Sequence, residues 1–253
     1  MNTAAAASAC GLVALLAVSS ADAHKGITSK FTYNADVYPV FLNRCGRCHI
    51  DGGVGPMSLV KYEDAFPWAE SIRAELLSTS PDPHDFVKAA HRQISARELD
   101  IVLDWATGGT PEGDKAATPE PPPFRNEWAA GRPSLTVPMA SPYQMPASAL
   151  EATHEVAMPI PVEMPRTMTQ IDLLPGNPAI VRSAALSLRS PDGTARVLGT
   201  WVPRQSAAPI ALKPPVRIDP GSQIVARIHY KKTWKFEGVR VTDQSSIGLY
   251  AAD

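Results

Sequence analysis

The chain has 253 residues, of which 44% are hydrophobic, so it is long enough for one large domain or two ordinary ones. Its 24 lysines and arginines balance 25 aspartates and glutamates, which excludes an overall field that would attract nucleic acid or an anionic membrane. The 25 prolines are about twice the usual share and favour extended segments and sheet edges over a purely helical bundle.

Residues 1–23 have the features of a secretory signal peptide. An apolar run around 12–18 is followed by the small-x-small pattern of 21–23, which predicts cleavage before His24. The basic start of a typical signal is absent, and the apolar stretch 3–21 is nearly long enough to remain as an uncleaved membrane anchor. We therefore expect a periplasmic or otherwise exported protein, membrane-associated if this segment or a partner complex holds it there. No second membrane segment is expected beyond residue 23.

Residues 31–113 are predicted to form a helical domain. The first helix is expected over 34–45 with Asn34 as its cap, and the second over 62–78. A capping box of Ser95 and Glu98 begins the third, which ends at 108–109. The apolar residues expected to face inward are Val37, Val40, Phe41, Ile72, Leu76, Leu77, Leu99, Val102, Leu103 and Ala106.

A proline-rich segment separates this domain from a second one. Residues 110–124 contain five prolines, and we place the linker at 114–133. Beyond it the apolar period becomes two, in short stretches divided by proline and glycine, which predicts an antiparallel β-sandwich of the jelly-roll kind over 134–253. The turn at 190–194 predicts a hairpin, because Gly193 can adopt positive φ. Strands are expected within 134–139, 154–160, 169–175, 179–190, 195–202, 215–221, 222–230 and 246–251.

The sequence Cys45-Gly-Arg-Cys48-His49 is the main chemical signal of the chain. A thioredoxin-type disulfide belongs in a βαβ setting and needs no adjacent histidine, whereas a structural zinc site needs four ligands. The only other cysteine, Cys10, lies in the signal segment. Covalent attachment of haem c uses every residue of the motif, with Cys45 and Cys48 as thioethers and His49 as the proximal iron ligand. Haem is the favoured interpretation, and disulfide and zinc are the alternatives.

Residues 31–113 resemble a class of exported cytochrome c domains in which "GxxPMSL…YEDAxPWA" follows the haem motif, here from Gly52 to Ala69. The resemblance implies that Pro56 orients His49, although an ordinary turn is the alternative. Related domains supply a methionine as sixth ligand from the segment corresponding to 79–86, where this chain has Ser80. The resemblance therefore leaves His84 as the favoured distal ligand, His91 as the second choice, and an open or unusual ligand as the third.

Residues 134–253 resemble the C-terminal β-domain of copper type II, ascorbate-dependent monooxygenases, most closely at 214–238 and 245–253. That family binds copper through an H-x-H pair and a methionine. Here His229 keeps the first position but Lys231 takes the second, and an ammonium has no lone pair to donate. Copper is therefore not expected. The methionines between 139 and 168 are expected to fill the core or a sheet edge: Met139, Met145, Met158, Met164 and Met168.

The sequence favours an α+β chain of two domains, a small helical cytochrome c domain followed by a β-sandwich, with one covalent haem c. Its expected role is single-electron transfer with a redox protein partner or a membrane-bound electron-transfer complex, and no small-molecule substrate is predicted. An electron carrier or accessory subunit is favoured over an enzyme. The alternatives are a non-catalytic scaffolding subunit of such a complex and a copper monooxygenase with a fused haem domain.

Overall fold

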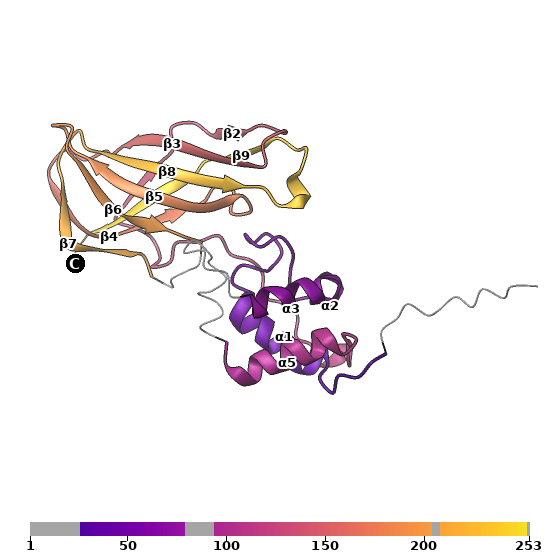
Figure 1. The fold of residues 1–253 in the computed structure, drawn as a ribbon. Coiled ribbons are helices and arrows are strands. Elements are labelled where there is room, and N and C mark those ends of the chain that lie inside the picture. Colours follow the sequence, from indigo (N-terminus) through magenta and orange to yellow (C-terminus); the bar gives the residue numbers. More distant parts are fainter. Residues whose placement is uncertain (1–25, 79–93, 204–207, 252–253) are drawn as a thin grey trace, which may run out of the picture.

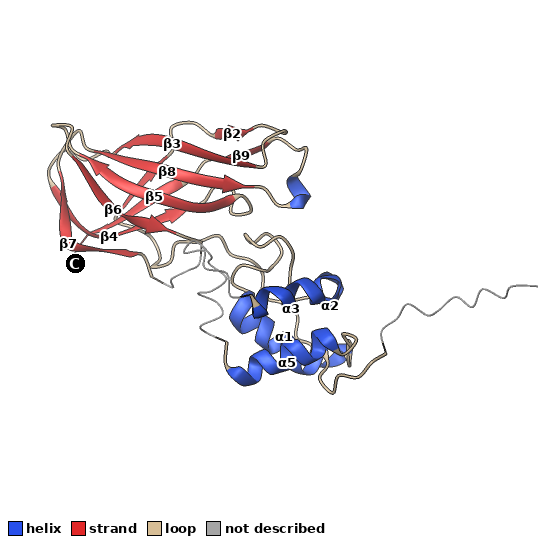
Figure 2. Cartoon of the chain, viewed as in Figure 1, coloured by secondary structure: helices blue, strands red, loops and turns tan. Residues whose placement is uncertain are grey.

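The computed structural model describes residues 26–78, 94–203 and 208–251, and it combines a helical N-terminal part with antiparallel sheets (Figures 1 and 2). The expected signal segment and the candidate ligands His84 and His91 lie outside the described residues. No helix within the described residues has both the length and the apolar character needed to cross a bilayer.

The helical part is built from short elements. Tyr33–Val37 (η1), Tyr38–Val40 (α1) and Phe41–Cys45 (η2) follow one another without a break, so together they form the first helix. The later elements are α2 (Tyr62–Ala65), η3 (Phe66–Trp68), α3 (Ala69–Leu77), α5 (Ala96–Thr107) and η4 (Lys115–Ala117). The predicted second helix is present as α2, η3 and α3, which also follow one another without a break from Tyr62 to Leu77. It tightens to a 3-10 turn at η3, where Pro67 lacks the N–H of a regular α-helix.

The cap of the first helix differs from the prediction. The Thr32 hydroxyl accepts a hydrogen bond from the Ala35 amide, and the Asp36 carboxylate accepts one from the Thr32 amide at 2.8 Å. Asn34 is wrong as the cap, since it is buried inside the helix with its side-chain amide directed at the Gly113 carbonyl. Thr32, two residues earlier, caps the exposed amide of Ala35, so the Asn34 side chain is available for a long-range contact.

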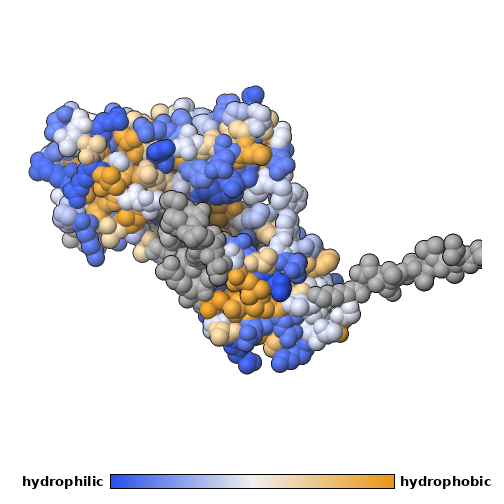
Figure 3. All heavy atoms as spheres, in the orientation of Figure 1, coloured by the Kyte–Doolittle hydropathy of each residue, from blue (hydrophilic) through white to orange (hydrophobic). Residues whose placement is uncertain are grey.

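The capping box of Ser95 and Glu98 and the end of α5 at Gly108 are confirmed. On α5, Val102 and Ala106 are buried as predicted. Leu99 and Leu103 are only half-buried, and Ile101 and Trp105 are buried instead. Leu77 was also wrongly assigned to the core, since it is 49% exposed. Exposed apolar surface is visible on the helical part in Figure 3.

An aromatic cluster forms the core of the helical part. Trp105 is fully buried, and its ring lies 5.9 Å from that of Tyr33 and 6.1 Å from that of Phe41, at tilted and edge-on angles that aromatic pairs favour. The Trp105 indole donates to the Pro111 carbonyl, and the Tyr33 amide donates to the same oxygen. Residues 110–113 therefore belong to this core rather than to a free linker.

The C-terminal part consists of two four-stranded antiparallel sheets and a two-stranded ribbon. One sheet has the order β1-β10-β4-β7, the other β3-β8-β5-β6, and β2 pairs with β9. Their bounds are β1 (Leu135–Pro138), β2 (Tyr143–Met145), β3 (Glu151–Pro159), β4 (Arg166–Leu174), β5 (Val181–Arg189), β6 (Ala195–Trp201), β7 (Ile210–Ile218), β8 (Gln223–Lys231), β9 (Val241–Asp243) and β10 (Ser246–Ala251). The buried side chains of both larger sheets form one continuous core, and Figure 1 shows the sheets as two layers.

The hairpin predicted at 190–194 is confirmed. It joins β5 to β6, Gly193 has φ of 86°, and the Ser190 amide donates to the Thr194 carbonyl at 2.9 Å. The short strands β2 and β9 were not predicted, since neither has more than three residues.

Residues 122–129 connect the helical part to the sandwich through specific contacts. Phe124 lies over Gly52 of the loop that follows the Cys-x-x-Cys-His motif, because a Cβ on Gly52 would come within 3.5 Å of the ring. On the other side, the side-chain amide of Asn126 donates to the Pro175 carbonyl, and the backbone amide of Ala129 donates to the Asp172 carboxylate. This part of the predicted linker is thus anchored at both ends.

Candidate functional site

The chemical motif lies where the first helix ends. Cys45 is the last residue of η2, and its carbonyl accepts hydrogen bonds from the Cys48 amide at 3.0 Å and the His49 amide at 2.9 Å. One turn of backbone therefore presents both cysteines and the histidine together. The sequence places these residues close in any fold, but the helix end and the shared carbonyl fix their relative orientation.

The imidazole of His49 is oriented through its Nδ1. That nitrogen lies 3.2 Å from the Met57 carbonyl oxygen, so the tautomer with the proton on Nδ1 donates to it and leaves the Nε2 lone pair for a metal. The resemblance assigned the orienting role to Pro56, but the carbonyl at this place belongs to its neighbour Met57. Burial lowers the pKa of His49, with the Met57 contact opposing the shift in part, which favours the neutral, ligating form.

Two glycines let the following loop fold closely around the motif. A Cβ on Gly55 would come within 2.7 Å of Nδ1 and 2.8 Å of Cγ of His49. A Cβ on Gly53 would come within 2.4 Å of the Cys48 carbonyl oxygen. Both positions require the absence of a side chain, so the loop is shaped to hold the imidazole in one place.

Gly55→Ala is expected to displace the imidazole of His49 and destabilise the helical part by about 1–3 kcal/mol, the usual cost of overpacking. Gly26→Ala is the matched control, because a Cβ there meets nothing within 4 Å. Chemical denaturation measures the free energy of unfolding. The absorption spectrum of the protein with its cofactor bound shows whether His49 is still a metal ligand. An unchanged denaturation midpoint for Gly55→Ala would contradict the close packing of this loop against His49.

The two cysteines are present as thiols rather than as a disulfide. Burial, with a contribution from Cys48, raises the pKa of the Cys45 thiol to about 11. Thiols that act as nucleophiles or bind metals as thiolates have lowered pKa values instead. The surroundings of Cys45 therefore favour a neutral sulfur.

Alkylation of Cys45 in protein without cofactor is expected to be slow at neutral pH and to accelerate as the pH approaches 11. The pKa of a cysteine thiol in the unfolded chain is about 8.5. The folded protein binds this proton more tightly, so the shift adds to the free energy of unfolding in full below about pH 8.5. This contribution is lost as the pH rises from there towards the folded value. Timed alkylation with peptide mapping measures the rate. If the alkylation rate of Cys45 reaches half its maximum at the same pH in the folded protein as in the denatured chain, or at a lower pH, the described burial would be contradicted.

A buried polar atom in the helical part lacks a partner. The hydroxyl of Tyr38, on the helix that leads to Cys45, has no hydrogen-bond partner within the described residues, although the residue is only 2% exposed. Buried hydroxyls are nearly always paired. An unmet hydroxyl in this core is compatible with a bound polar group that completes the site.

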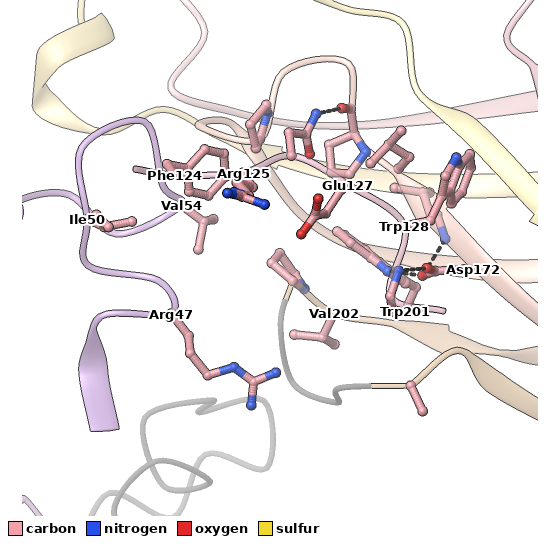
Figure 4. A pocket seen from close by; sticks show the side chains of 18 of the residues that line it. Arg47, Ile50, Val54, Phe124, Arg125, Glu127, Trp128, Asp172, Trp201 and Val202 are labelled. Carbon is pink, nitrogen blue, oxygen red and sulfur yellow. Dashed lines mark hydrogen bonds between the residues drawn. The ribbon is translucent and has the colours of Figure 1, made fainter. Parts of the chain in front are cut away.

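A cavity of about 640 Å³ lies between the motif loop and the sandwich (Figure 4). Arg47, Ile50 and Val54 line it from the motif loop, and Trp128 and Trp201 from the other side. Its volume is within the range of small-molecule sites. Cys45, Cys48 and His49 are not among the described residues of its lining, so this hollow lies beside the motif and is not the space that the thiols face.

The wall of this cavity is held by the buried carboxylate of Asp172. It accepts hydrogen bonds from the Trp201 indole at 3.0 Å, the Ala129 amide at 3.0 Å and the Leu173 amide at 2.8 Å. Figure 4 shows the indole of Trp201 directed at this carboxylate. Asp172 is thereby satisfied, and its role is to fix the segment between the domains to β4. The sequence offered no periodic signal for this residue.

The copper-site candidates of the sandwich have other partners. His229 Nε2 lies 2.8 Å from one carboxylate oxygen of Glu151, and Lys231 Nζ lies 3.9 Å from the other. Met164 is 72% exposed, whereas the other four methionines of the cluster are buried in the sandwich core, as predicted: Met139, Met145, Met158 and Met168. Across residues 26–78, 94–203 and 208–251, no group of three or more His, Cys, Asp or Glu side chains is placed to hold a metal ion.

No protein-family model matches the chain, and no curated protein is significantly similar to it.

Proposed function

We propose that the chain is an exported c-type cytochrome that acts in single-electron transfer, with a small helical haem domain over 31–113 joined to a jelly-roll-like β-domain. The observation that carries the proposal is the Cys-x-x-Cys-His turn whose histidine directs Nδ1 at a backbone carbonyl and so leaves Nε2 for iron. Cys45 and Cys48 would hold the haem as thioethers, and His49 would be the proximal ligand. Bound haem would supply one-electron exchange at its iron.

The residues around the motif support this assignment over a thiolate site. A thioether carries no charge, so the burial that raises the pKa of Cys45 does not oppose it. Gly53 and Gly55 allow the loop to approach the histidine, and the Tyr38 hydroxyl supplies a buried donor. For the sixth ligand we propose His84 first and His91 second.

The proposed partner is a redox protein or a membrane-bound electron-transfer complex outside the cytoplasm. The contacts of residues 122–129 on both sides suit a sandwich that holds the haem domain in a fixed position, which is also what a scaffolding subunit would need. The contacts of His229 and Lys231 with Glu151 favour a surface role over copper chemistry.

A pyridine haemochrome spectrum of the exported chain tests the proposal. The expected spectrum is that of haem with both vinyl groups converted to thioethers, and the pigment should stay with the polypeptide after acid–acetone extraction. Exported, folded protein that carries no covalent haem in a host competent for cytochrome c maturation would contradict the proposal.

A further inference from the structure

The cavity between the motif loop and the sandwich has aromatic walls that the proposed function does not use. Its volume is about 640 Å³, and the rings of Phe124, Trp128 and Trp201 are part of its lining. No residue to which the proposed function gives a role in haem binding is among the described lining residues. Because cavities of this size and apolar character commonly bind small molecules, the cavity is a candidate site of its own.

The two tryptophans are held in place by separate contacts. The Trp201 indole donates to the buried Asp172 carboxylate at 3.0 Å. The Trp128 ring lies on Gly248 of β10, because a Cβ on that glycine would come within 2.8 Å of the ring carbon Cζ3. Prolines at five described positions of the lining add rigid apolar surface: Pro122, Pro123, Pro175, Pro178 and Pro203. Walls that are already ordered lower the entropic cost of binding a flat apolar ligand.

The charged side chains of the cavity favour a ligand with a negative charge. Arg47 and Arg125 are in the described lining, together with the acids Glu127 and Asp172. Asp172 is only 4% exposed and already accepts three hydrogen bonds, so Glu127 is the acid that faces the two arginines. Figure 4 shows the side chain of Arg47 extending from the motif loop toward the side of the cavity that carries Val202.

Arg47 has the capacity to bind an anion. Its side chain is exposed, and no carboxylate in the part of the chain that the structure describes forms an ion pair with it. A guanidinium offers two parallel N–H donors to a carboxylate or a sulfonate. The cavity therefore combines aromatic walls with a cation at the edge formed by the motif loop.

We propose that this cavity is a binding site for a small aromatic anion, a flat ring system that carries one carboxylate or sulfonate group. The rings would lie against Trp128 and Trp201, where burial of their apolar surface stabilises the complex. The anionic group would face Arg47. Binding involves no covalent or redox step and does not require haem, so this inference goes beyond the proposed function.

Equilibrium dialysis of the full-length protein against two probes tests the charge of the ligand. Anilinonaphthalene sulfonate is an aromatic anion, and phenylnaphthylamine has the same rings without the sulfonate. We expect one anionic probe to bind per chain, and Arg47→Gln to weaken its binding by about tenfold, the effect of losing a charge-assisted hydrogen bond. The affinity for the uncharged probe should not change. Arg189→Gln is the matched control, because it removes an exposed arginine of β5 outside the described lining.

A second pair of variants tests the aromatic wall. Trp128→Ala should weaken the binding of both probes by about tenfold, because both lose a ring on which to stack. Trp234→Ala is the control, since this exposed indole on η5 (Trp234–Phe236) is outside the described lining and its loss should leave both affinities unchanged. Circular dichroism checks that the variants are folded. If Trp128→Ala does not fold, Trp128→Leu serves as the second variant with the same expected loss.

The outcomes separate the site from the charge of its ligand. Absence of binding of either probe to the wild type, or wild-type affinities in Trp128→Ala, would overturn the site. An unchanged affinity of Arg47→Gln for the anionic probe, or an equal loss for both probes, would overturn the role of Arg47 and the choice of an anion. The haemochrome spectrum of the same protein tests the proposed function separately, because probe binding does not depend on haem.

Discussion

Replacing both Cys45 and Cys48 with serine is expected to abolish covalently bound haem, leaving a folded polypeptide without the pigment. Serine is nearly isosteric with cysteine but forms no thioether with a haem vinyl group. The single variants should each retain at most one thioether and so shift the haemochrome band relative to the wild type. Absorption of the purified proteins after acid–acetone extraction measures this. Undiminished haem in the double variant would contradict the assignment of the two thiols.

His49→Ala separates attachment from ligation. The thiols remain, so any haem that is attached should lose its proximal nitrogen ligand and show an altered spin state by electron paramagnetic resonance. Lys61→Ala is a matched control on the same loop, because its contact with Asp51 is an exposed ion pair that contributes little to stability. A wild-type spin state in His49→Ala would rule out the described histidine as the iron ligand.

Trp105→Ala is expected to destabilise the helical part by about 3–5 kcal/mol, the cost of truncating a fully buried aromatic side chain. Trp105 contacts the rings of Tyr33 and Phe41, so its loss opens a cavity. It also removes one of the two hydrogen bonds that the Pro111 carbonyl accepts. Phe41 is the first residue of η2, the helical turn that ends at Cys45. Because Trp105 packs on Phe41, we expect the amount of bound haem to fall as the helical part loses stability.

Denaturant titration followed by circular dichroism measures the effect of Trp105→Ala. The matched control is Trp234→Ala in the sandwich, where the indole is 54% exposed and its loss should change stability by no more than about 0.5 kcal/mol. Equal effects of the two substitutions would contradict the described helical core.

The features of the fold that depend on a few neighbouring residues were predictable from the sequence. The capping box at Ser95, the hairpin at Gly193 and the alternation of β8 are local patterns, and the structure has them where they were expected. The cap of the first helix was missed because Thr32 and Asp36 compete with Asn34. On α5 only the two leucines were wrongly placed in the core, because the aromatic cluster around Trp105 determines how that helix packs.

The candidate site was predictable in its motif but not in its surroundings. Cys45, Cys48 and His49 are adjacent in sequence, so the spacing alone identifies them. The carbonyl of Met57 and the close approach of Gly55 depend on how the loop folds back onto His49. Contacts that depend on the path of an irregular loop leave no periodic pattern in one sequence.

The central claim is that the Cys-x-x-Cys-His turn carries one covalent haem. Intact-mass spectrometry of the protein, exported from a host that matures cytochromes c and denatured before measurement, tests it most directly. We predict a mass equal to that of the polypeptide plus one haem, with Cys45 and Cys48 both protected from alkylation. A mass equal to the polypeptide alone, with both thiols alkylated, would contradict the claim.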